Sequence, residues 1–406
     1  MIYNHYQIKP KTNKKKYYIL VFIFCFLAFS YFKNSTFSVA PQQVVNFNRS
    51  AKNVRIDWPK DSQAAIGATG YGVLAKSSPK LLKKPIASTA KIMTAYAILK
   101  HKPLKVGEQG PLITITAKDV ALYQHYVALD GSVVPVNVGE KISQYQALQA
   151  ILLPSSNNMS DTLAVWAFGS MDNYLIYANN LAKQMGLNDT TISDASGFSP
   201  KTVSTPNDLV MLSQAAMANP VFAQIVAQAE ATIPVAGKIK NYNHLLGSNG
   251  IIGVKTGNTD EAGGCFVFAS KKTIGKHSVT IIGAVTGAPT RLEALKQSDL
   301  LVNESVKNFE TVKIANPNQA VAEYKTPWGS SAKAITKDGI EILRWQGNKI
   351  NGATNIKKAT NKSRAHDKIG SVEIIDGSNK HHKKLVLDNS LHRPSFWWRL
   401  LHFYIL

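Results

Sequence analysis

Three short polar motifs, widely separated along the chain, place the strongest constraint on its fold. They read Ser88-Thr89-Ala90-Lys91, Ser155-Ser156-Asn157 and Lys255-Thr256-Gly257. Serine, lysine and asparagine side chains in these patterns can act together only if the fold brings all three motifs to one place. The intervals are long enough for a helical subdomain. We therefore expect helices between the first motif and a strand that carries the last one.

Sequence context distinguishes Ser88 from other serines in the same pattern. The pattern S-x-x-K begins at four positions: Ser30, Ser77, Ser88 and Ser330. Only the copy at Ser88 opens a predicted helix, because apolar residues recur behind it at helical spacing. A lysine three residues after a serine shares its helix face, so the Lys91 amine can reach the Ser88 hydroxyl. A capping serine beside a solvated lysine is the alternative for an isolated copy; the other two motifs favour the catalytic interpretation.

The second motif is predicted to lie in a loop. Ser155 follows Pro154, between an apolar run and the next helical pattern. The register has one alternative, because Ser156-Asn157-Asn158 also fits S-x-N, although Ser155 fits better as the first residue after the proline. Taken alone, a cluster of serine and asparagine is usually a turn or a helix cap.

The third motif is predicted to begin at the end of a strand. Residues 251–254 form an apolar run that Lys255 closes, and two further strand-like runs follow at 265–269 and 278–285. Gly257 permits close approach of a ligand to the backbone. K-T-G alone is a common surface turn, but its place on a strand before a hairpin favours a functional site.

The N-terminus predicts export. Residues 1–16 contain five lysines and no acidic residue, and 17–32 form an uninterrupted, mostly apolar run. This run is slightly long for the apolar core of a signal peptide and slightly short for a membrane span. Residues 38–40 end in small side chains, but Pro41 follows directly, so we favour a retained anchor over a cleaved signal. The lysine-rich side then stays in the cytoplasm, and the chain after Lys33 lies outside.

Composition limits the kinds of partner and cofactor that this chain is expected to bind. The formal net charge of +22 suits lipid headgroups or anionic wall polymers outside a cell better than nucleic acid; a solvated basic surface is the alternative. Cys25 lies in the apolar run, so no internal disulfide with Cys265 is expected, and Cys265 is predicted to be a small buried strand residue. His381-His382 lacks further ligands at a recognisable spacing. We expect neither a metal nor another cofactor.

The coarse pattern predicts an α/β fold followed by a β-rich region. Runs at 64–68 and 71–75 indicate a hairpin, helical patterns fill the middle, and a helix is expected at about 290–309. The first and last strands can then share one antiparallel sheet with helices on both faces. After Val312, short segments between turn residues indicate a small β domain. These segments are 320–324, 332–335, 340–345 and 370–375.

The last stretch, residues 393–406, is too short to span a bilayer. Ser395 can cap a helix on which Arg399 and His402 share a face, and the remaining surface is aromatic or aliphatic. This pattern predicts an interfacial anchor. A packed terminal helix is the alternative.

The three motifs occur in the order used by penicillin-interacting serine enzymes. Residues 62–307 resemble the low-molecular-mass penicillin-binding proteins of the serine-type D-alanyl-D-alanine carboxypeptidase family, which implies a β-lactamase/transpeptidase-like antiparallel sheet flanked by helices. The resemblance extends beyond the trio to stretches at 85–88 (PIAS), 152–155 (LLPS), 194–198 (DASGF), 204–209 (STPNDL) and 255–263 (KTGNTDEAG). Two departures are mild. Asn158 stands where the family often has aspartate, and Asn258 stands where histidine or tyrosine is frequent, which puts the substrate preference in doubt.

The resemblance implies a serine acyl-enzyme mechanism. Ser88 is expected to attack the carbonyl carbon of the penultimate D-alanine, with Lys91 as the base. The ordinary pKa of a lysine is about 10.4, so burial and a neighbouring cation, for which Lys255 is the candidate, must lower the pKa of Lys91. Ser155 is expected to relay a proton to the leaving amine.

The same resemblance assigns the substrate-binding groups. Asn157 is expected to hold the substrate peptide, and Lys255-Thr256-Gly257 to line the site of its terminal carboxylate. The backbone N–H groups of Ser88 and Asn258 are expected to form the oxyanion hole.

A β-lactamase and a non-catalytic binding protein are the two main alternatives to a carboxypeptidase. A class A β-lactamase needs a glutamate-bearing loop between the second and third motifs, yet the only glutamate between Asn158 and Val254 is Glu230, without the expected pattern. A non-catalytic protein that binds the wall or senses β-lactams is disfavoured because all three motifs are intact. Endopeptidase or transpeptidase action stays open, because other peptides and acceptors can use the same acyl-enzyme.

These features divide the chain into a cytoplasmic basic segment (1–16), a signal sequence or membrane anchor (17–33), a leader or linker (34–60), a D,D-carboxypeptidase domain (61–309), a small β-rich domain (310–390) and an amphipathic membrane-associating tail (391–406). The expected location is the outer, wall-facing side of the cell membrane. The expected partners are peptidoglycan stem peptides ending in D-Ala-D-Ala, β-lactams as covalent inhibitors, the membrane surface and anionic wall polymers.

Overall fold

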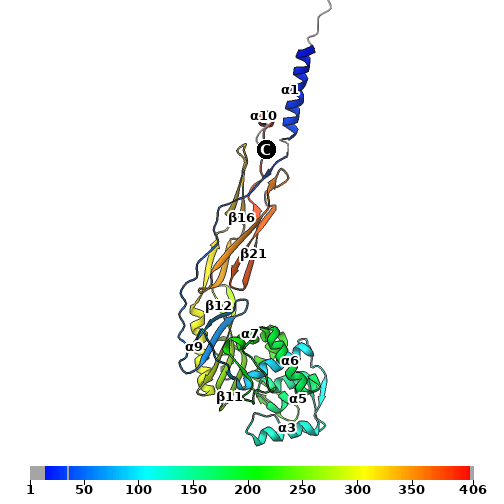
Figure 1. Ribbon diagram of the computed structural model, residues 1–406, viewed down its shortest axis with the longest axis vertical. Helices are drawn as coiled ribbons and strands as arrows, with labels where there is room; N and C mark the ends of the chain where they lie inside the picture. The colour runs from blue at the N-terminus through cyan, green and yellow to red at the C-terminus, as the bar shows by residue number, and fades with distance from the viewer. Residues whose placement is uncertain (1–13, 34–35, 403–406) are drawn as a thin grey trace, which may run out of the picture.

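The computed structural model describes residues 14–33 and 36–402. Figure 1 shows an elongated molecule, with helix α1 (Lys14–Lys33) at one end, a β-rich region in the middle and a module of sheet and helices at the other end. The short C-terminal helix α10 (Phe396–Leu401) lies at the same end as α1. The first part of the predicted basic segment and the last residues of the predicted tail lie outside the described residues.

One five-stranded antiparallel sheet organises the distal module, with the strand order β11-β12-β13-β3-β4. Its strands are β3 (Gln63–Ala68), β4 (Gly72–Lys76), β11 (Ile251–Thr259), β12 (Gly263–Ile274) and β13 (His277–Ala288). β3 pairs with β13, and Ala65 lies opposite Ala284. The prediction that the first and last strands share one antiparallel sheet is therefore confirmed.

The two faces of this sheet contact different hydrophobic clusters, because successive side chains on a strand point to opposite faces. Ala65 belongs to the cluster that contains Leu209 of α7 (Pro206–Met217). Ile66 belongs to the cluster that contains Leu301 of α9 (Arg291–Lys307). Helices therefore cover both faces, as predicted.

A helical subdomain packs on the α7 side of the sheet (Figure 1). Its helices are α2 (Lys91–His101), α3 (Ala117–Ala128), α4 (Gln144–Leu152), α5 (Asn157–Phe168), α6 (Met171–Gln184) and α8 (Pro220–Val226), and its paired short strands are β5 (Lys84–Pro85) with β8 (Val203–Ser204), β6 (Leu112–Thr114) with β7 (Lys141–Ser143), and β9 (Glu230–Ile233) with β10 (Gly237–Lys240). Helix α2 runs through the core, because eight of its residues are buried. This central position fixes the first motif against its neighbours.

The region after α9 consists of strands, which confirms the predicted β-rich C-terminal part. The strands are β14 (Phe309–Ala315), β15 (Gln319–Lys325), β16 (Ser331–Thr336), β17 (Ile340–Trp345), β18 (Ile350–Ile356), β19 (Ala359–Thr360), β20 (Lys368–Asp376) and β21 (Asn379–Leu387). The four predicted segments fall within β15, β16, β17 and β20. Strand β21 was missed, because only Leu385 and Leu387 are buried in a run otherwise rich in histidine and lysine.

The segment 34–60, predicted to be a leader or linker, is built into the C-terminal β region where the structure describes it. β2 (Gln42–Gln43) pairs with β15, and Phe47 is 1% exposed inside the second hydrophobic cluster. The part of the segment around β2 and Phe47 therefore packs against the C-terminal β region, while the assignment of 34–60 as a leader or linker stays a prediction. Sequence patterns missed this packing because isolated apolar residues in a polar stretch show no periodicity.

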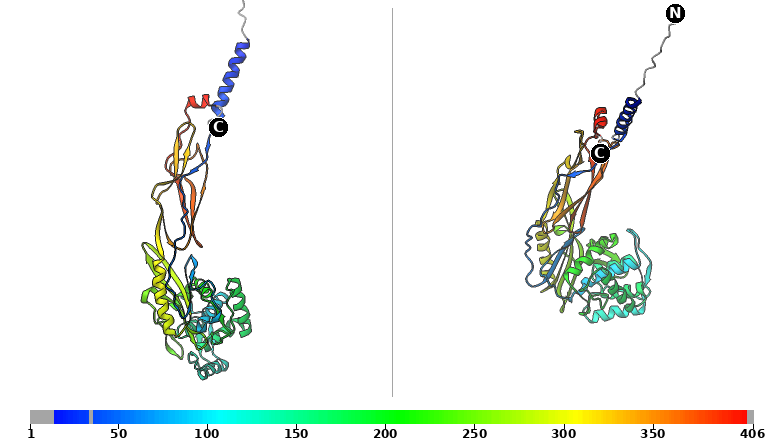
Figure 2. Two further views of the ribbon diagram at one scale, coloured as in Figure 1. Left: turned by 60° about the vertical axis from the view of Figure 1, so that its left-hand side comes forward. Right: turned by 45° about the horizontal axis from the view of Figure 1, so that its top comes forward.

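The two terminal helices contact each other (Figure 2). The Ser30 hydroxyl of α1 is buried and donates to the Arg399 backbone carbonyl at 2.8 Å. The rings of Tyr31 and Phe396 lie 5.5 Å apart. Ser395 caps α10, as predicted, by accepting from the Trp398 N–H. Helix α1 has the length and composition of a membrane span, a property that signal sequences share.

Replacing Phe47 by alanine should lower the free energy of unfolding by about 3–5 kcal/mol, the usual cost of deleting a buried aromatic side chain. Val44, 51% exposed on the same segment, provides the matched control, and Val44→Ala should have little effect. Chemical denaturation followed by tryptophan fluorescence measures both variants. Equal, small losses would show that the segment is not part of the folded region.

Candidate active site

Ser88 and Lys91 meet where two helices join. Ser88 lies in the 3-10 helix η1 (Ala87–Ala90), and Lys91 opens α2. Side chains three residues apart eclipse each other in a 3-10 helix, and Lys91 Nζ lies 2.8 Å from Ser88 Oγ. Ser88 is partly exposed, whereas Lys91 is fully buried. An accessible hydroxyl thus shares a hydrogen bond with an amine that can accept its proton.

The backbone is strained at Ala87, next to Ser88, and at Ser155 itself. Ala87 has a φ of 46° and Ser155 a φ of 67°, values in the left-handed region that non-glycine residues rarely adopt. Gly197, with a φ of +74°, supports Ala87, because a Cβ at Gly197 would lie only 1.9 Å from the Ala87 carbonyl oxygen. Such strain is a feature of functional sites and persists only where the surrounding packing imposes it.

The second motif lies between α4 and α5 and contacts the first. Asn157 Oδ1 accepts from Lys91 Nζ at 2.8 Å, while Ser156 caps α5. Asn158 instead donates to and accepts from the Val134 backbone, which favours the register that starts at Ser155. The buried Ser155 Oγ has no hydrogen-bond partner among the described residues, so it is free to bond a substrate.

The third motif brings a strand against Ser88. A Cβ at Gly257 would lie 2.9 Å from the Ser88 backbone nitrogen and 3.1 Å from that of Thr89, so only glycine allows this approach. The motif lies on β11, as expected, but Lys255 does not close this strand: β11 continues to Thr259, and Thr256 pairs with Phe266 of β12. Asn258 follows at the exposed end of the strand.

Burial of the Lys91 and Lys255 amines is the main cause of their lowered pKa values. Desolvation lowers the pKa of Lys91 to about 7, against the opposing effects of Asp194 and Asp161. Burial also holds the pKa of Lys255 well below its ordinary value, with repulsion from Lys91 and Arg291 adding to the shift. For Lys91, desolvation is therefore the main cause of the lowered pKa. The expectation that Lys255 also lowers it stays a prediction.

A third contact to the Lys91 amine comes from a loop for which the sequence suggested no role. The Ser196 carbonyl accepts from Lys91 Nζ at 2.8 Å. Asp194 shapes this loop, because its carboxylate accepts from the N–H groups of Ser196 and Phe198. The stretch 194–198 carried a family resemblance, but a backbone carbonyl has no side-chain signature from which a role could be predicted.

A second carboxyl, that of Asp161, acts on the amine. Tyr126 OH of α3 donates to Asp161 Oδ2 of α5 at 2.8 Å. Burial raises the pKa of Asp161 to about 6. Asp161 acts on Lys91 through its charge, because among the described residues the Lys91 amine donates to Ser88, Asn157 and Ser196 and not to Asp161.

Burial also raises the pKa of Cys265 on β12, to about 11, so this residue stays a neutral thiol.

A nucleophilic serine with a lysine base, supported by S-x-N and K-T-G motifs, is the arrangement of penicillin-interacting serine enzymes. The sheet and helical subdomain of the present fold hold the three motifs together in that arrangement. Residues 60–290, more than half of the chain, match the D-alanyl-D-alanine carboxypeptidase family Peptidase_S11. The chain belongs to this family of serine peptidases.

Individual relatives agree with this assignment. The chain is 30% identical over 253 residues to the D-alanyl-D-alanine carboxypeptidase of Streptomyces sp. (strain K15), covering 57% of this chain and 84% of the relative. It is 24% identical over 336 residues to D-alanyl-D-alanine carboxypeptidase DacC of Escherichia coli (strain K12), covering 79% and 81%.

Solved structures support the fold. The Streptomyces K15 DD-transpeptidase superposes with a TM-score of 0.54 at 27% identity, covering 61% of this chain and 98% of that chain. Penicillin binding protein 5 of Haemophilus influenzae gives a TM-score of 0.59 at 19% identity and covers 84% and 99%. The second match therefore includes the arrangement of the β-rich C-terminal region as well.

Acylation of Ser88 by penicillin should accelerate as the pH rises through about 7, because only the neutral Lys91 amine can accept the serine proton and its pKa is about 7. Asp161→Asn removes a charge that raises this pKa, so the midpoint should move to lower pH. The second-order acylation rate, measured by stopped flow between pH 5 and 9, reports the midpoint.

Asp189→Asn is the control, because Asp189 is exposed and paired with Lys83; its midpoint should match that of the unchanged chain. Loss of the pH dependence in Asp161→Asn would assign the titration to Asp161 rather than to Lys91.

Proposed function

We propose that this chain is a D-alanyl-D-alanine carboxypeptidase that removes the terminal D-alanine from peptidoglycan stem pentapeptides through an acyl-enzyme. The contact between the buried Lys91 amine and Ser88 Oγ, at 2.8 Å, carries the proposal. At neutral pH a large fraction of an amine with a pKa of about 7 is unprotonated, so the base is available where an ordinary lysine would be charged.

Acylation begins when Ser88 Oγ attacks the carbonyl carbon of the penultimate D-alanine and its proton moves to Lys91 Nζ. The oxyanion that forms is stabilised by the backbone N–H groups of Ser88 and Asn258, at about 3 kcal/mol for a donor of this kind. The peptide C–N bond then breaks. The leaving amine takes a proton relayed through Ser155 Oγ, which is otherwise unpartnered among the described residues.

The terminal carboxylate of the substrate is held by Lys255 and Thr256. Among the described residues, Lys255 Nζ donates to the Thr256 backbone carbonyl alone, at 3.0 Å, and burial lowers its pKa. An arriving carboxylate favours the charged amine, so substrate binding raises the pKa of Lys255 and creates the ion pair that holds the peptide. The Asn157 amide positions the peptide next to Ser88.

Deacylation restores the enzyme. Lys91 takes a proton from water, the hydroxide attacks the ester carbonyl, and the C–O bond to Ser88 breaks with return of a proton to its oxygen. A penicillin adduct is expected to deacylate slowly, which disfavours a β-lactamase. Glu230 is half-exposed on β9 and pairs with Lys238 at 2.7 Å, so it does not serve as the glutamate that a class A β-lactamase requires.

Release of D-alanine from a pentapeptide ending in D-Ala-D-Ala, measured with the detergent-solubilised chain, tests the function. Release should disappear in Ser88→Ala and after penicillin treatment, and peptide mapping should find one penicilloyl group on Ser88. The adduct should outlast many turnovers of peptide. Labelling of another serine would refute the nucleophile, and rapid turnover of penicillin would favour the β-lactamase.

Lys255→Ala should reduce kcat/KM for the pentapeptide by at least a hundredfold, because it removes the cation that pairs with the substrate carboxylate. Lys271→Ala, an exposed lysine on the neighbouring strand β12, should change it less than twofold. Thermal unfolding checks that both variants fold. A near-normal kcat/KM in a stable Lys255→Ala protein would show that the carboxylate binds elsewhere.

We also place this enzyme on the outer face of the cell membrane, held by a retained α1. The apolar side chains of α1 are mostly exposed in the structure, as a lipid-facing helix requires, and the lysines before Tyr17 favour a cytoplasmic start. The tail adds a second contact: Phe396 and Trp397 on α10 are 57% and 67% exposed, and aromatic side chains of this kind prefer the membrane interface.

Removal of residues 393–406 from a chain that starts at Thr36 should weaken sedimentation with anionic liposomes, because the tail is then the main apolar contact. D-Alanine release should persist, since α10 lies at the other end of the molecule from the sheet and helices that carry the motifs (Figure 1). The same chain with its tail intact is the control, and salt titration separates the charge contribution. Equal binding by both forms would refute the tail anchor, while loss of activity would support a packed structural helix.

A further inference from the structure

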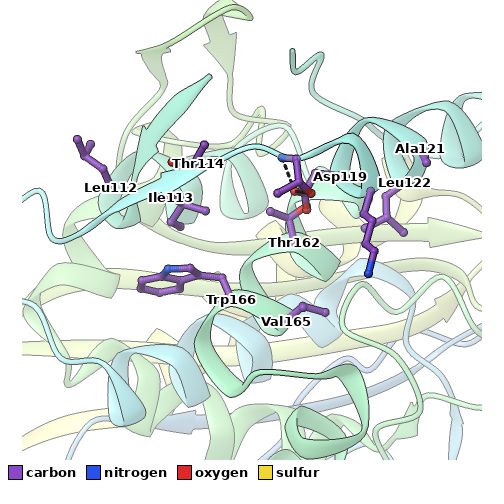
Figure 3. Close-up of a pocket in the computed structure, with 11 residues that line it drawn as sticks. Leu112, Ile113, Thr114, Asp119, Ala121, Leu122, Thr162, Val165 and Trp166 are labelled. Carbon is purple, nitrogen blue, oxygen red and sulfur yellow. Dashed lines mark hydrogen bonds between the residues drawn. The ribbon is translucent and has the colours of Figure 1, made fainter. Parts of the chain in front are cut away.

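An apolar groove lies on the helical subdomain, outside the catalytic motifs (Figure 3). It has a volume of about 720 Å³ and lies between the strand β6 and the helices α3 and α5. Its apolar walls come from Leu112, Ile113, Ala121, Leu122, Val165 and Trp166. Leu112 is 62% and Val165 41% exposed. Apolar side chains that gather in one groove mark a binding surface more often than scattered ones do.

The backbone of β6 offers a second feature. In the part of the chain that the structure describes, β6 pairs with β7 alone. The Ile115 N–H donates to Glu140, and the Gln144 N–H donates to the Pro111 carbonyl. Because the hydrogen-bonding direction alternates along an antiparallel strand, the polar backbone groups of Leu112 and Thr114 point to the other edge. An edge of this kind can accept an additional strand.

The charged side chains at the groove are one carboxylate and two lysines. Asp119 is occupied internally, because its carboxylate accepts from the Thr116 N–H and from the Thr162 hydroxyl, each at 2.8 Å. Lys118 lines the groove and is exposed, and Lys102 Nζ lies 5.2 Å from the centre of the Trp166 ring. Asp119 keeps its negative charge, so two lysines against one carboxylate leave a net charge of +1 at the groove, which favours an occupant with a carboxylate.

We propose that this groove binds an extended segment of a partner protein, with apolar side chains at alternate positions and an acidic residue beside them. The segment adds to the free edge of β6, its apolar side chains pack against Val165 and Trp166, and its carboxylate meets Lys118. The unpaired backbone edge favours a peptide over a lipid, because an acyl chain cannot satisfy backbone hydrogen bonds.

The groove lies near the catalytic motifs without including them. Val165 lies eight residues after Asn157 on α5, roughly 12 Å along the helix axis at the rise of an α-helix. A partner seated there is close to the catalytic site and does not touch Ser88 or Lys91. The helical subdomain also lies at the end of the molecule opposite α1 (Figure 1), where it is accessible to other proteins.

A displayed library of random decapeptides tests the proposal against the full chain in lipid nanodiscs, with counter-selection against Val165→Glu. Fluorescence anisotropy then measures the affinity of the enriched peptides. Val165→Glu should weaken binding at least tenfold, and Val127→Glu, at a 50% exposed site of α3 that does not line the groove, less than twofold. Thermal unfolding and D-alanine release check that both variants are folded.

Two further measurements address the geometry. Lys118→Glu should weaken the binding of the acidic peptides. Peptides in which the acidic residue is replaced by lysine should bind Lys118→Glu better than they bind the unchanged chain. Hydrogen exchange at the amides of Leu112 and Thr114 should slow when peptide is bound, which a helix seated in the groove would not cause.

Failure to enrich any Val165-dependent peptide would overturn the proposal, as would binding without protection of β6. Competition by empty lipid vesicles would assign the groove to lipid instead. A self-association of the chain that Val165→Glu abolishes would assign it to a second copy.

Discussion

Burial of the Lys91 amine is the interaction on which the site depends. Its three acceptors, Ser88 Oγ, Asn157 Oδ1 and the Ser196 carbonyl, come from three separate segments, so the amine joins η1, α5 and the 194–198 loop. Burying an amine disfavours its charge, and the pKa falls to about 7. The same desolvation that costs stability therefore suits Lys91 to the role that we propose for it, as the base that activates the Ser88 hydroxyl without a histidine.

Close backbone contacts hold these segments at the required distances. Gly197 supports the strained Ala87 from one side, and Gly257 brings β11 against the Ser88 nitrogen from the other. Side chains at either glycine would separate the elements by more than a hydrogen bond tolerates. Ser88, the proposed nucleophile, is thus positioned by packing between a helical subdomain and a sheet, and its geometry depends on both parts.

The sequence predicted the parts of this arrangement that have a local pattern. Apolar spacing behind Ser88 indicated α2, alternation and turn residues indicated β3, β12 and β13, and the cap at Ser395 indicated α10. The three motifs, together with the resemblance around them, were sufficient to assign the family. Other elements lack such a signal: β21 is rich in histidine and lysine, and the segment around Phe47 is polar apart from isolated residues, so neither shows the periodicity of a buried strand.

Sequence by itself determined which chemical groups are present, their order and the helix or strand that carries each of them, because these follow from residue type and spacing. Only the tertiary structure decided that the Ser196 carbonyl accepts a hydrogen bond from Lys91, that the charge of Asp161 acts on this amine, and that Lys255 is buried. A backbone carbonyl exists at every residue, and a pKa depends on burial and on charges from distant segments. Such properties arise from contacts across the fold, and no local pattern encodes them.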